Sequence, residues 1–199
     1  MHHPAKRQNM YRSRLWPNKI RFSLILWSLA ILSALTIYSG ALAQSSSNPS
    51  GLPLPRFATT RSEPINVRVG PGIRYEVVWV YVKAGVPIEI IQEFDTWRKV
   101  RDFEGEEGWI HQNLLSGRRA GRVNRVGLSG QIALRAKRSE QADIRAWLGP
   151  DYPVQIEQCD GEWCAVRAKF KTEEKKEKTY SGYLPQDSLW GVYPNEKFD

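Results

Sequence analysis

The sequence has 199 residues, of which 41% are hydrophobic and 25% are charged. This ordinary globular composition excludes collagen-like, wholly disordered and multi-span membrane proteins. The formal net charge is +8, but residues 1–43 hold six basic and no acidic residues, whereas the other 156 residues hold 23 basic and 21 acidic ones. Because the excess charge lies in the N-terminal segment, the electrostatic case for a nucleic-acid-binding protein is weak.

The N-terminal segment has the organisation of a signal peptide. Its basic residues precede an apolar run from Phe22 to Tyr38, and Ala41-Leu42-Ala43 stands before Gln44. Signal peptidase accepts small residues in this pattern, so we expect cleavage between Ala43 and Gln44. The apolar run of 17 residues is also close to the roughly 20 that span a bilayer, which leaves an uncleaved anchor as the alternative. Both alternatives predict export: a periplasmic or secreted protein, or one anchored in the inner membrane and facing the periplasm.

The rest of the chain is strand-like. Residues 44–56 are rich in Ser, Pro and Gly and are expected to form a flexible tether. Beyond the tether, short β-branched and aromatic runs alternate with Gly, Pro and Asp-Gly pairs, and no stretch keeps a helical period. The clearest predicted strands are residues 76–82, 86–91, 97–101 and 108–111.

The strand-like region contains an internal repeat. At a separation of 66 residues, Pro87-Ile88-Glu89-Ile90 corresponds to Pro153-Val154-Gln155-Ile156, and Trp97-Arg98-Lys99-Val100 corresponds to Trp163-Cys164-Ala165-Val166. Arg68 and Arg135 are 67 residues apart, and Gly108 and Gly182 are 74 apart. The repeat predicts module one at 57–116, a basic linker at 117–130, module two at 131–194 with a charged hairpin insertion at 169–179, and a tail at 195–199. Each module is near the size at which a single core is marginally stable, so we expect the two to pack together.

The two cysteines, Cys159 and Cys164, flank an Asp-Gly turn. In an exported protein this spacing predicts a structural disulfide between two adjacent strands. A loop this short stabilises the fold less than a long one.

Five short motifs mark module one: Asn-Val-Arg-Val-Gly-Pro-Gly at 66–72, Lys-Ala-Gly-Val-Pro at 83–87, Trp-Arg-Lys-Val at 97–100, Gly-Trp-Ile at 108–110 and Leu-Leu at 114–115. Together they resemble the bacterial SH3-like (SH3b) domain. Module two lacks the Gly-Pro-Gly turn and is a weaker match. The flanking segments 51–57 and 189–194 are similar to those of a subfamily of exported tandem-SH3 proteins. The resemblance implies an all-β fold of two small barrels after the N-terminal hydrophobic helix. It also implies binding of cell-wall material (peptidoglycan) or extended peptides rather than catalysis.

Alternation along the strands predicts which residues form the core. In module one we assign to it Val78, Val80 and Val82, together with Val86, Ile88 and Ile90. The 66-residue offset assigns Ile144, Ala146 and Leu148 to the core of module two, and it pairs Tyr81 with Trp147.

The opposite face of module one would then be aromatic, with Trp79, Tyr81 and Trp97 pointing outward. One interpretation is a shallow groove that stacks glycan rings or a peptide, with Arg68 and Tyr75 on its rim as hydrogen-bond partners for carboxylates. The alternative is that these aromatic side chains pack against the other module or the segment 52–57. The missing Gly-Pro-Gly turn of module two assigns a ligand groove to module one.

The region between the modules is basic, because residues 108–139 hold seven basic and no acidic residues. It is interpreted as a solvated linker or as a contact for anionic phospholipid head groups or wall carboxylates.

An enzyme is not expected. His111 is the only histidine after the leader, and bridged cysteines leave neither a Cys-His pair nor a set of zinc ligands. We predict a non-catalytic binding module without metal or cofactor, whose partner is cell-wall material or an envelope protein or peptide. The alternative is a structural or adaptor protein of the envelope whose aromatic faces hold its modules together.

Overall fold

The computed structural model describes residues 48–124, 126–127, 129–171 and 176–199. The predicted leader, its cleavage site at Ala43 and Gln44, and the first residues of the tether lie outside this range. Within these residues the fold is all-β, as predicted, with two single turns of 3-10 helix. None of the helices in the described ranges could cross a membrane.

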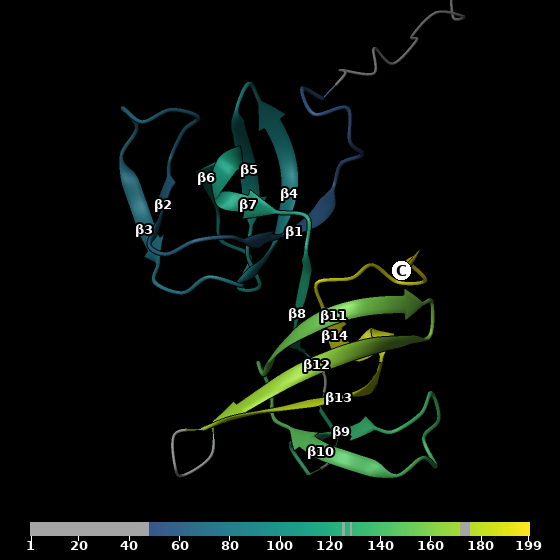
Figure 1. Cartoon of the computed structure of the whole chain (residues 1–199). Helices are drawn as coiled ribbons and strands as arrows, with labels where there is room; N and C mark the ends of the chain where they lie inside the picture. Colours follow the sequence, from purple (N-terminus) through teal and green to yellow (C-terminus); the bar gives the residue numbers. More distant parts are fainter. Residues whose placement is uncertain (1–47, 125, 128, 172–175) are drawn as a thin grey trace, which may run out of the picture. The chain divides into compact units, whose positions relative to one another are not determined.

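Module one is an antiparallel sheet with the strand order β3-β2-β6-β5-β4-β1-β7 (Figure 1). Its strands are β1 (Arg56–Thr60), β2 (Ile65–Arg68), β3 (Val77–Tyr81), β4 (Pro87–Phe94), β5 (Trp97–Arg101), β6 (Glu107–His111) and β7 (Leu115–Ser116), and the 3-10 turn η2 (Gln112–Leu114) precedes β7. The long strand β4 pairs with both β1 and β5, and its register with β5 shifts between Ile90 and Gln92. A bulge of this kind bends a strand and lets a small sheet curl around its core.

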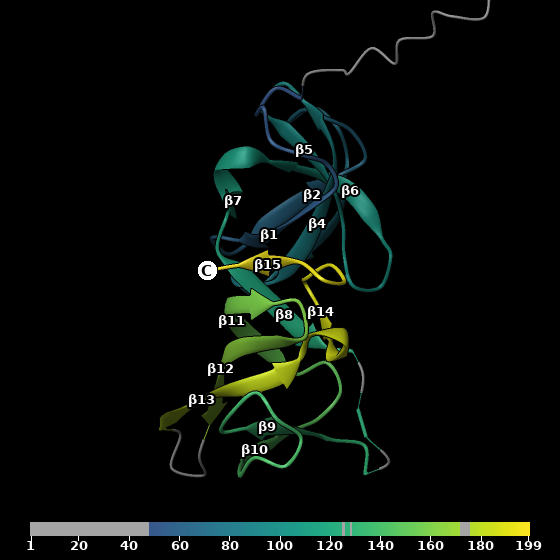
Figure 2. The same ribbon diagram turned by 90° about the vertical axis from the view of Figure 1, so that its right-hand side faces the viewer.

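Module two repeats this sheet with the order β10-β9-β13-β12-β11-β8-β14 (Figure 2). Its strands are β8 (Arg119–Val123), β9 (Ile132–Arg135), β10 (Ile144–Leu148), β11 (Pro153–Asp160), β12 (Trp163–Lys171), β13 (Glu177–Pro185) and β14 (Leu189–Trp190), with η3 (Gln186–Ser188) before β14 and β15 (Lys197–Phe198) beside β11. The two strand orders correspond position by position. The prediction of two tandem SH3-like barrels is therefore confirmed.

The structure differs from the predicted boundaries at three places. The expected linker 117–130 contains β8, which takes the place in module two that β1 has in module one. The tail 195–199 contains β15. The expected tether is docked from Ser50 onward, since Ser50 hydrogen-bonds Glu93 and Leu54 packs on the core of module one. These segments lack a strong strand pattern of their own: pairing with β11 orders β8 and β15, and contacts with Glu93 and the core order the tether.

The predicted direction of the valines on β3 is wrong. Val78, Val80 and Val82 are 47%, 42% and 73% exposed, whereas Trp79 and Tyr81 pack against the core. Val67 lies opposite Trp79 and Ile65 lies opposite Tyr81 on the neighbouring strand β2. Residues that face each other across two strands share one side of the sheet, so the two aromatic side chains follow Ile65 and Val67 inward. The predicted core positions Ile88 and Ile90 are buried.

The hairpin of β9 and β10 in module two corresponds to that of β2 and β3, and it shows why the predicted alignment of the repeat is off by one residue here. Leu134 lies opposite Ala146, and Ile132 lies opposite Leu148. In this hairpin the offset is therefore 67 residues, so Ala146 corresponds to Trp79 and Leu148 to Tyr81. Leu148 is buried and Ala146 packs on the core, but Ile144 is exposed and the prediction for it is wrong. Trp147 is exposed as well. It therefore corresponds to the exposed Val80, and its predicted correspondence to Tyr81 is wrong.

The predicted disulfide joins Cys159 and Cys164, which lie opposite each other on β11 and β12. Both residues belong to the buried core of module two. We expect reduction of this bond to lower the free energy of unfolding by about 2 kcal/mol, because the closed loop is short. Thermal unfolding with and without a reductant measures the effect. Two freely titratable thiols in the untreated protein would contradict the assignment.

Aromatic contacts join the two modules within the compact unit Ser47–Asp199. The Phe57 ring lies 5.1 Å from that of Trp190 and 4.7 Å from that of Tyr193, and Phe103 lies 5.7 Å from Trp190. The Tyr193 hydroxyl donates to Oε1 of Glu89 over 2.8 Å. Burial raises the pKa of Tyr193, and the Glu89 carboxylate acts in the same direction, so the phenol remains a donor.

Candidate functional site

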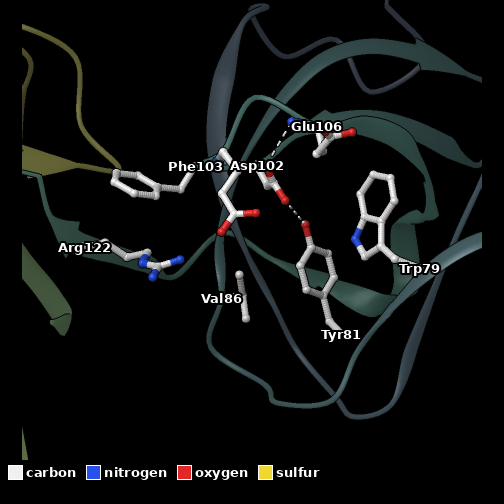
Figure 3. Close-up of a pocket in the computed structure, with 8 residues that line it drawn as sticks. Trp79, Tyr81, Val86, Asp102, Phe103, Glu106 and Arg122 are labelled. Carbon is white, nitrogen blue, oxygen red and sulfur yellow. Dashed lines mark hydrogen bonds between the residues drawn. The ribbon is translucent and has the colours of Figure 1, made fainter. Parts of the chain in front are cut away.

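A pocket of about 460 Å³ lies beside β3 and the turn between β5 and β6 (Figure 3). We call it the aromatic pocket. It is lined by Trp79, Tyr81, Val86, Asp102, Phe103, Glu104, Glu106 and Arg122. All of these residues except Arg122, which lies on β8, belong to module one.

Strand β3 supplies the aromatic wall. The rings of Trp79 and Tyr81 meet edge to face, with centroids 6.1 Å apart. A Cβ at Gly108 on β6 would lie 2.4 Å from Val67 and 3.1 Å from the Trp79 ring, so only glycine lets the indole pack this closely. The indole Nε1 is buried and forms no well-aligned hydrogen bond with the described residues, although the Tyr81 hydroxyl is close enough for the indole N–H to lower the pKa of that phenol. A buried donor that lacks a well-aligned hydrogen bond is costly, and a ligand acceptor would satisfy it.

The turn after β5 places carboxylates opposite this wall. Oδ1 of Asp102 accepts hydrogen bonds from the backbone N–H of Glu104 (2.9 Å) and of Glu106 (3.0 Å), which fixes the turn. Oδ2 of Asp102 accepts one from the Tyr81 hydroxyl at 3.3 Å, the bond drawn in Figure 3. Burial raises the pKa of Tyr81 and outweighs the nearby Trp79 N–H, which lowers it; the Asp102 carboxylate raises it further, so the phenol stays protonated and continues to donate.

The lining of the aromatic pocket carries more acidic than basic side chains. Glu104 and Glu106 are exposed and form no ion pair with the other described residues. The single basic residue, Arg122, lies over the Phe103 ring at 4.8 Å and within 3.6 Å of Asp151. Aromatic faces beside unpaired carboxylates attract cations, so the aromatic pocket suits an ammonium group.

The predicted rim residues lie elsewhere. Arg68 donates from Nη1 to the backbone oxygen of Tyr75 over 2.6 Å, and the Tyr75 ring packs so closely on Gly70 that a Cβ there would lie 2.6 Å from it. These contacts hold the loop between β2 and β3. Arg135 makes the equivalent bond to Ala142 in module two, which gives a structural reason for an arginine at both positions.

Trp97 is also separate from the aromatic pocket. Its ring packs edge to face on His111 at 5.4 Å, and Nδ1 of His111 accepts from the backbone N–H of Asn113.

Of the five predicted ligand-binding residues, the structure therefore brings Trp79 and Tyr81 together in the aromatic pocket. The sequence analysis did not identify Asp102, Glu104 and Glu106 as site residues. Three carboxylates within residues 102–106, between two predicted strands, are the signal that could have pointed to them. The described residues hold no group of three or more potential metal ligands.

Comparison with known proteins gives one family match and two similar structures. The family of the bacterial SH3 domain matches residues 61–117, and no curated protein matches the chain. The chain is similar to NlpC2 and NlpC1 from Trichomonas vaginalis, at 14% and 15% sequence identity and a TM-score of 0.29 for each. The similar regions cover 68% and 74% of this chain and 48% of each of the other two, so the chain spans about half of their length. Residues 61–117, which hold β2 to β7 and most of the aromatic pocket, thus match the bacterial SH3 domain family, as the motifs of module one predicted.

Proposed function

We propose that this protein is an exported, non-catalytic binding protein of the cell envelope, whose aromatic pocket takes a short segment of a cell-wall peptide. The observation that carries the proposal is the pairing of Trp79 and Tyr81 with an acidic turn, in a pocket where the buried indole N–H lacks a well-aligned hydrogen bond. Module two has Ala146 and Leu148 at the corresponding core positions, so binding is assigned to module one.

The charge of the aromatic pocket selects the kind of peptide. Glu104 and Glu106 offer carboxylates to an ammonium group, which also gains from the aromatic faces of Trp79 and Tyr81. The Trp79 N–H then offers a hydrogen bond to a peptide carbonyl or carboxylate. The ligand is therefore proposed to be a peptide with a free amino group, as in the stem peptides of peptidoglycan, and not a neutral glycan chain.

Two observations support the non-catalytic, exported part of the proposal. The side chain of His111 is used in the turn after β6, and both cysteines are bridged. A structural disulfide is typical of an oxidising compartment, and the leader-like sequence of residues 1–43 agrees with such a location.

Binding to purified peptidoglycan sacculi tests the proposal. We expect Trp79→Ala to weaken binding by about 30-fold, since aromatic residues at the centre of a site contribute most of the affinity. The matched control is Trp97→Ala, which removes an indole of the same module outside the aromatic pocket and should retain binding.

Because Trp79 also contacts the core, a second variant separates binding from folding. Glu104→Gln with Glu106→Gln changes two exposed side chains and should preserve thermal stability while it weakens binding about tenfold. Wild-type affinity in this double variant, or equal losses with Trp79→Ala and Trp97→Ala, would refute the assigned site.

A second candidate function is favoured by the aromatic joint of Phe57, Trp190 and Tyr193. This joint is the module packing expected for a structural or adaptor protein, and it uses aromatic residues other than those of the aromatic pocket. In this alternative the chain does not bind sacculi, and it is recovered from the envelope with a partner protein whether or not Trp79 is present.

A further inference from the structure

A second concave surface, of about 940 Å³, lies between the end of β1 and the strands β11 and β12. We call it the basic groove. Its charged lining residues are all basic, namely Arg61, Arg118, Arg119, Arg167 and Lys169. It shares no residue with the aromatic pocket.

Three of these five cations have carboxylate partners. Arg119 pairs with Glu196 at 2.7 Å, Arg167 with Glu157 at 2.5 Å, and Lys169 with Glu177 at 3.4 Å. Neither Arg61 nor Arg118, both exposed, forms an ion pair or a side-chain hydrogen bond with another described residue. The groove therefore keeps an uncompensated positive charge at its wall.

The backbone that carries the two unpaired arginines is held firmly. The Arg118 N–H donates to Oγ of Ser116 at 3.2 Å, and its carbonyl accepts from Oγ1 of Thr59 at 2.6 Å. The Arg61 N–H donates to the carbonyl of Leu114 at 2.8 Å. Only the two side chains, and not the backbone, remain to be ordered when an anion binds, which lowers the entropic cost of binding.

We propose that the basic groove binds a linear anionic polymer, a chain that bears carboxylates or phosphates at regular intervals. A concave surface with separated cations suits a chain, whose successive anions reach the unpaired Arg61 and Arg118 in turn. A bilayer is a flat surface and would not follow the groove. The lining also offers no aromatic side chain to insert among lipids.

Binding of the purified chain to polygalacturonate, inorganic polyphosphate and uncharged dextran tests this proposal. We expect affinity for one or both polyanions that falls with added salt, and none for dextran. Polygalacturonate and polyphosphate distinguish carboxylates from phosphates as the preferred anion. Arg61→Gln with Arg118→Gln should weaken binding of the preferred polyanion about tenfold.

The matched control is Arg74→Gln with Lys137→Gln, which removes the same charge from exposed positions outside the basic groove and should change affinity less than about twofold. Trp79→Ala should leave polyanion binding intact, so this proposal and that for the aromatic pocket can fail separately. Equal losses in the two charge variants, or no binding to either polyanion, would overturn the proposal. Binding to vesicles of phosphatidylglycerol and phosphatidylcholine that depends on Arg61 and Arg118, without polyanion binding, would overturn it in favour of a membrane surface.

Discussion

Replacing Glu93 with alanine is expected to lower the free energy of unfolding by about 3–5 kcal/mol. The Glu93 side chain is 0% exposed and lies 3.1 Å from Nε of Arg98, which is itself only 5% exposed. It also pairs with Arg56 and accepts two hydrogen bonds from Ser50. Without this carboxylate, the Arg98 guanidinium remains buried and its charge is uncompensated, although it still donates to neutral oxygens. Denaturant unfolding measures the loss.

The control for this prediction is Glu177→Gln. Glu177 forms an exposed pair with Lys169 across β12 and β13, and exposed pairs contribute less than about 1 kcal/mol. A loss in Glu93→Ala no larger than that in the control would show that the buried network does not stabilise module one.

The same carboxylate predicts how stability changes with pH. Burial opposes the ionisation of Glu93, but the hydrogen bonds from Ser50 and Arg56 outweigh it and lower its pKa. A group whose pKa is lower in the folded state stabilises the protein above its ordinary pKa, and this contribution is lost as the pH falls through the folded value. The wild type should therefore lose stability below about pH 5, and Glu93→Gln should lose less over the same interval. Parallel pH profiles would contradict this role.

The second large effect is expected at the joint between the modules. Trp190 contacts Phe57 and Phe103 of module one, so Trp190→Ala should remove about 3 kcal/mol, the usual cost of deleting a well-packed large aromatic side chain. The modules should then unfold less cooperatively, and in the limit in two transitions, because the main contacts left between them are those of Tyr193 with Phe57 and Glu89 and of Arg122 with Phe103. Calorimetry distinguishes one transition from two.

Trp147→Ala is the matched control, because Trp147 is an exposed indole of module two that contributes to neither core cluster. It should leave a single transition at nearly the wild-type temperature. A single transition in Trp190→Ala, displaced no further than in this control, would mean that the aromatic joint does not couple the modules.

The sequence predicted the architecture well because strand signals are local. The motifs of module one, the buried Ile88 and Ile90 and the Cys159–Cys164 bridge all depend on alternation or on short turns. The inward face of β3 is different, because its sequence, Val-Val-Trp-Val-Tyr, is apolar on both faces. Only the register against Ile65 and Val67 decides that the aromatic side chains point inward.

The candidate site was predicted only in part for a related physical reason. Trp79 and Tyr81 stand on one strand, so their proximity follows from the sequence. Asp102 reaches Tyr81 across the curled sheet, and Arg122 reaches Phe103 from β8 in the other module. Contacts of this kind depend on the curvature of the sheet and on module packing, which local patterns do not encode. The segment 117–130 was predicted to be a linker for the same reason. Its residues form β8 because they pair with the distant strand β11, and local patterns do not predict that pairing.

The most direct test of the account is a titration of the ¹⁵N-labelled protein with a peptidoglycan stem peptide, followed by the indole N–H signals of its tryptophans. The account predicts that the Trp79 signal moves most, because its buried N–H gains a hydrogen-bond acceptor, while those of Trp97 and Trp147 stay in place. A titration that moves the Trp97 or Trp147 signal and leaves that of Trp79 unchanged would contradict the claim that the aromatic pocket is the binding site.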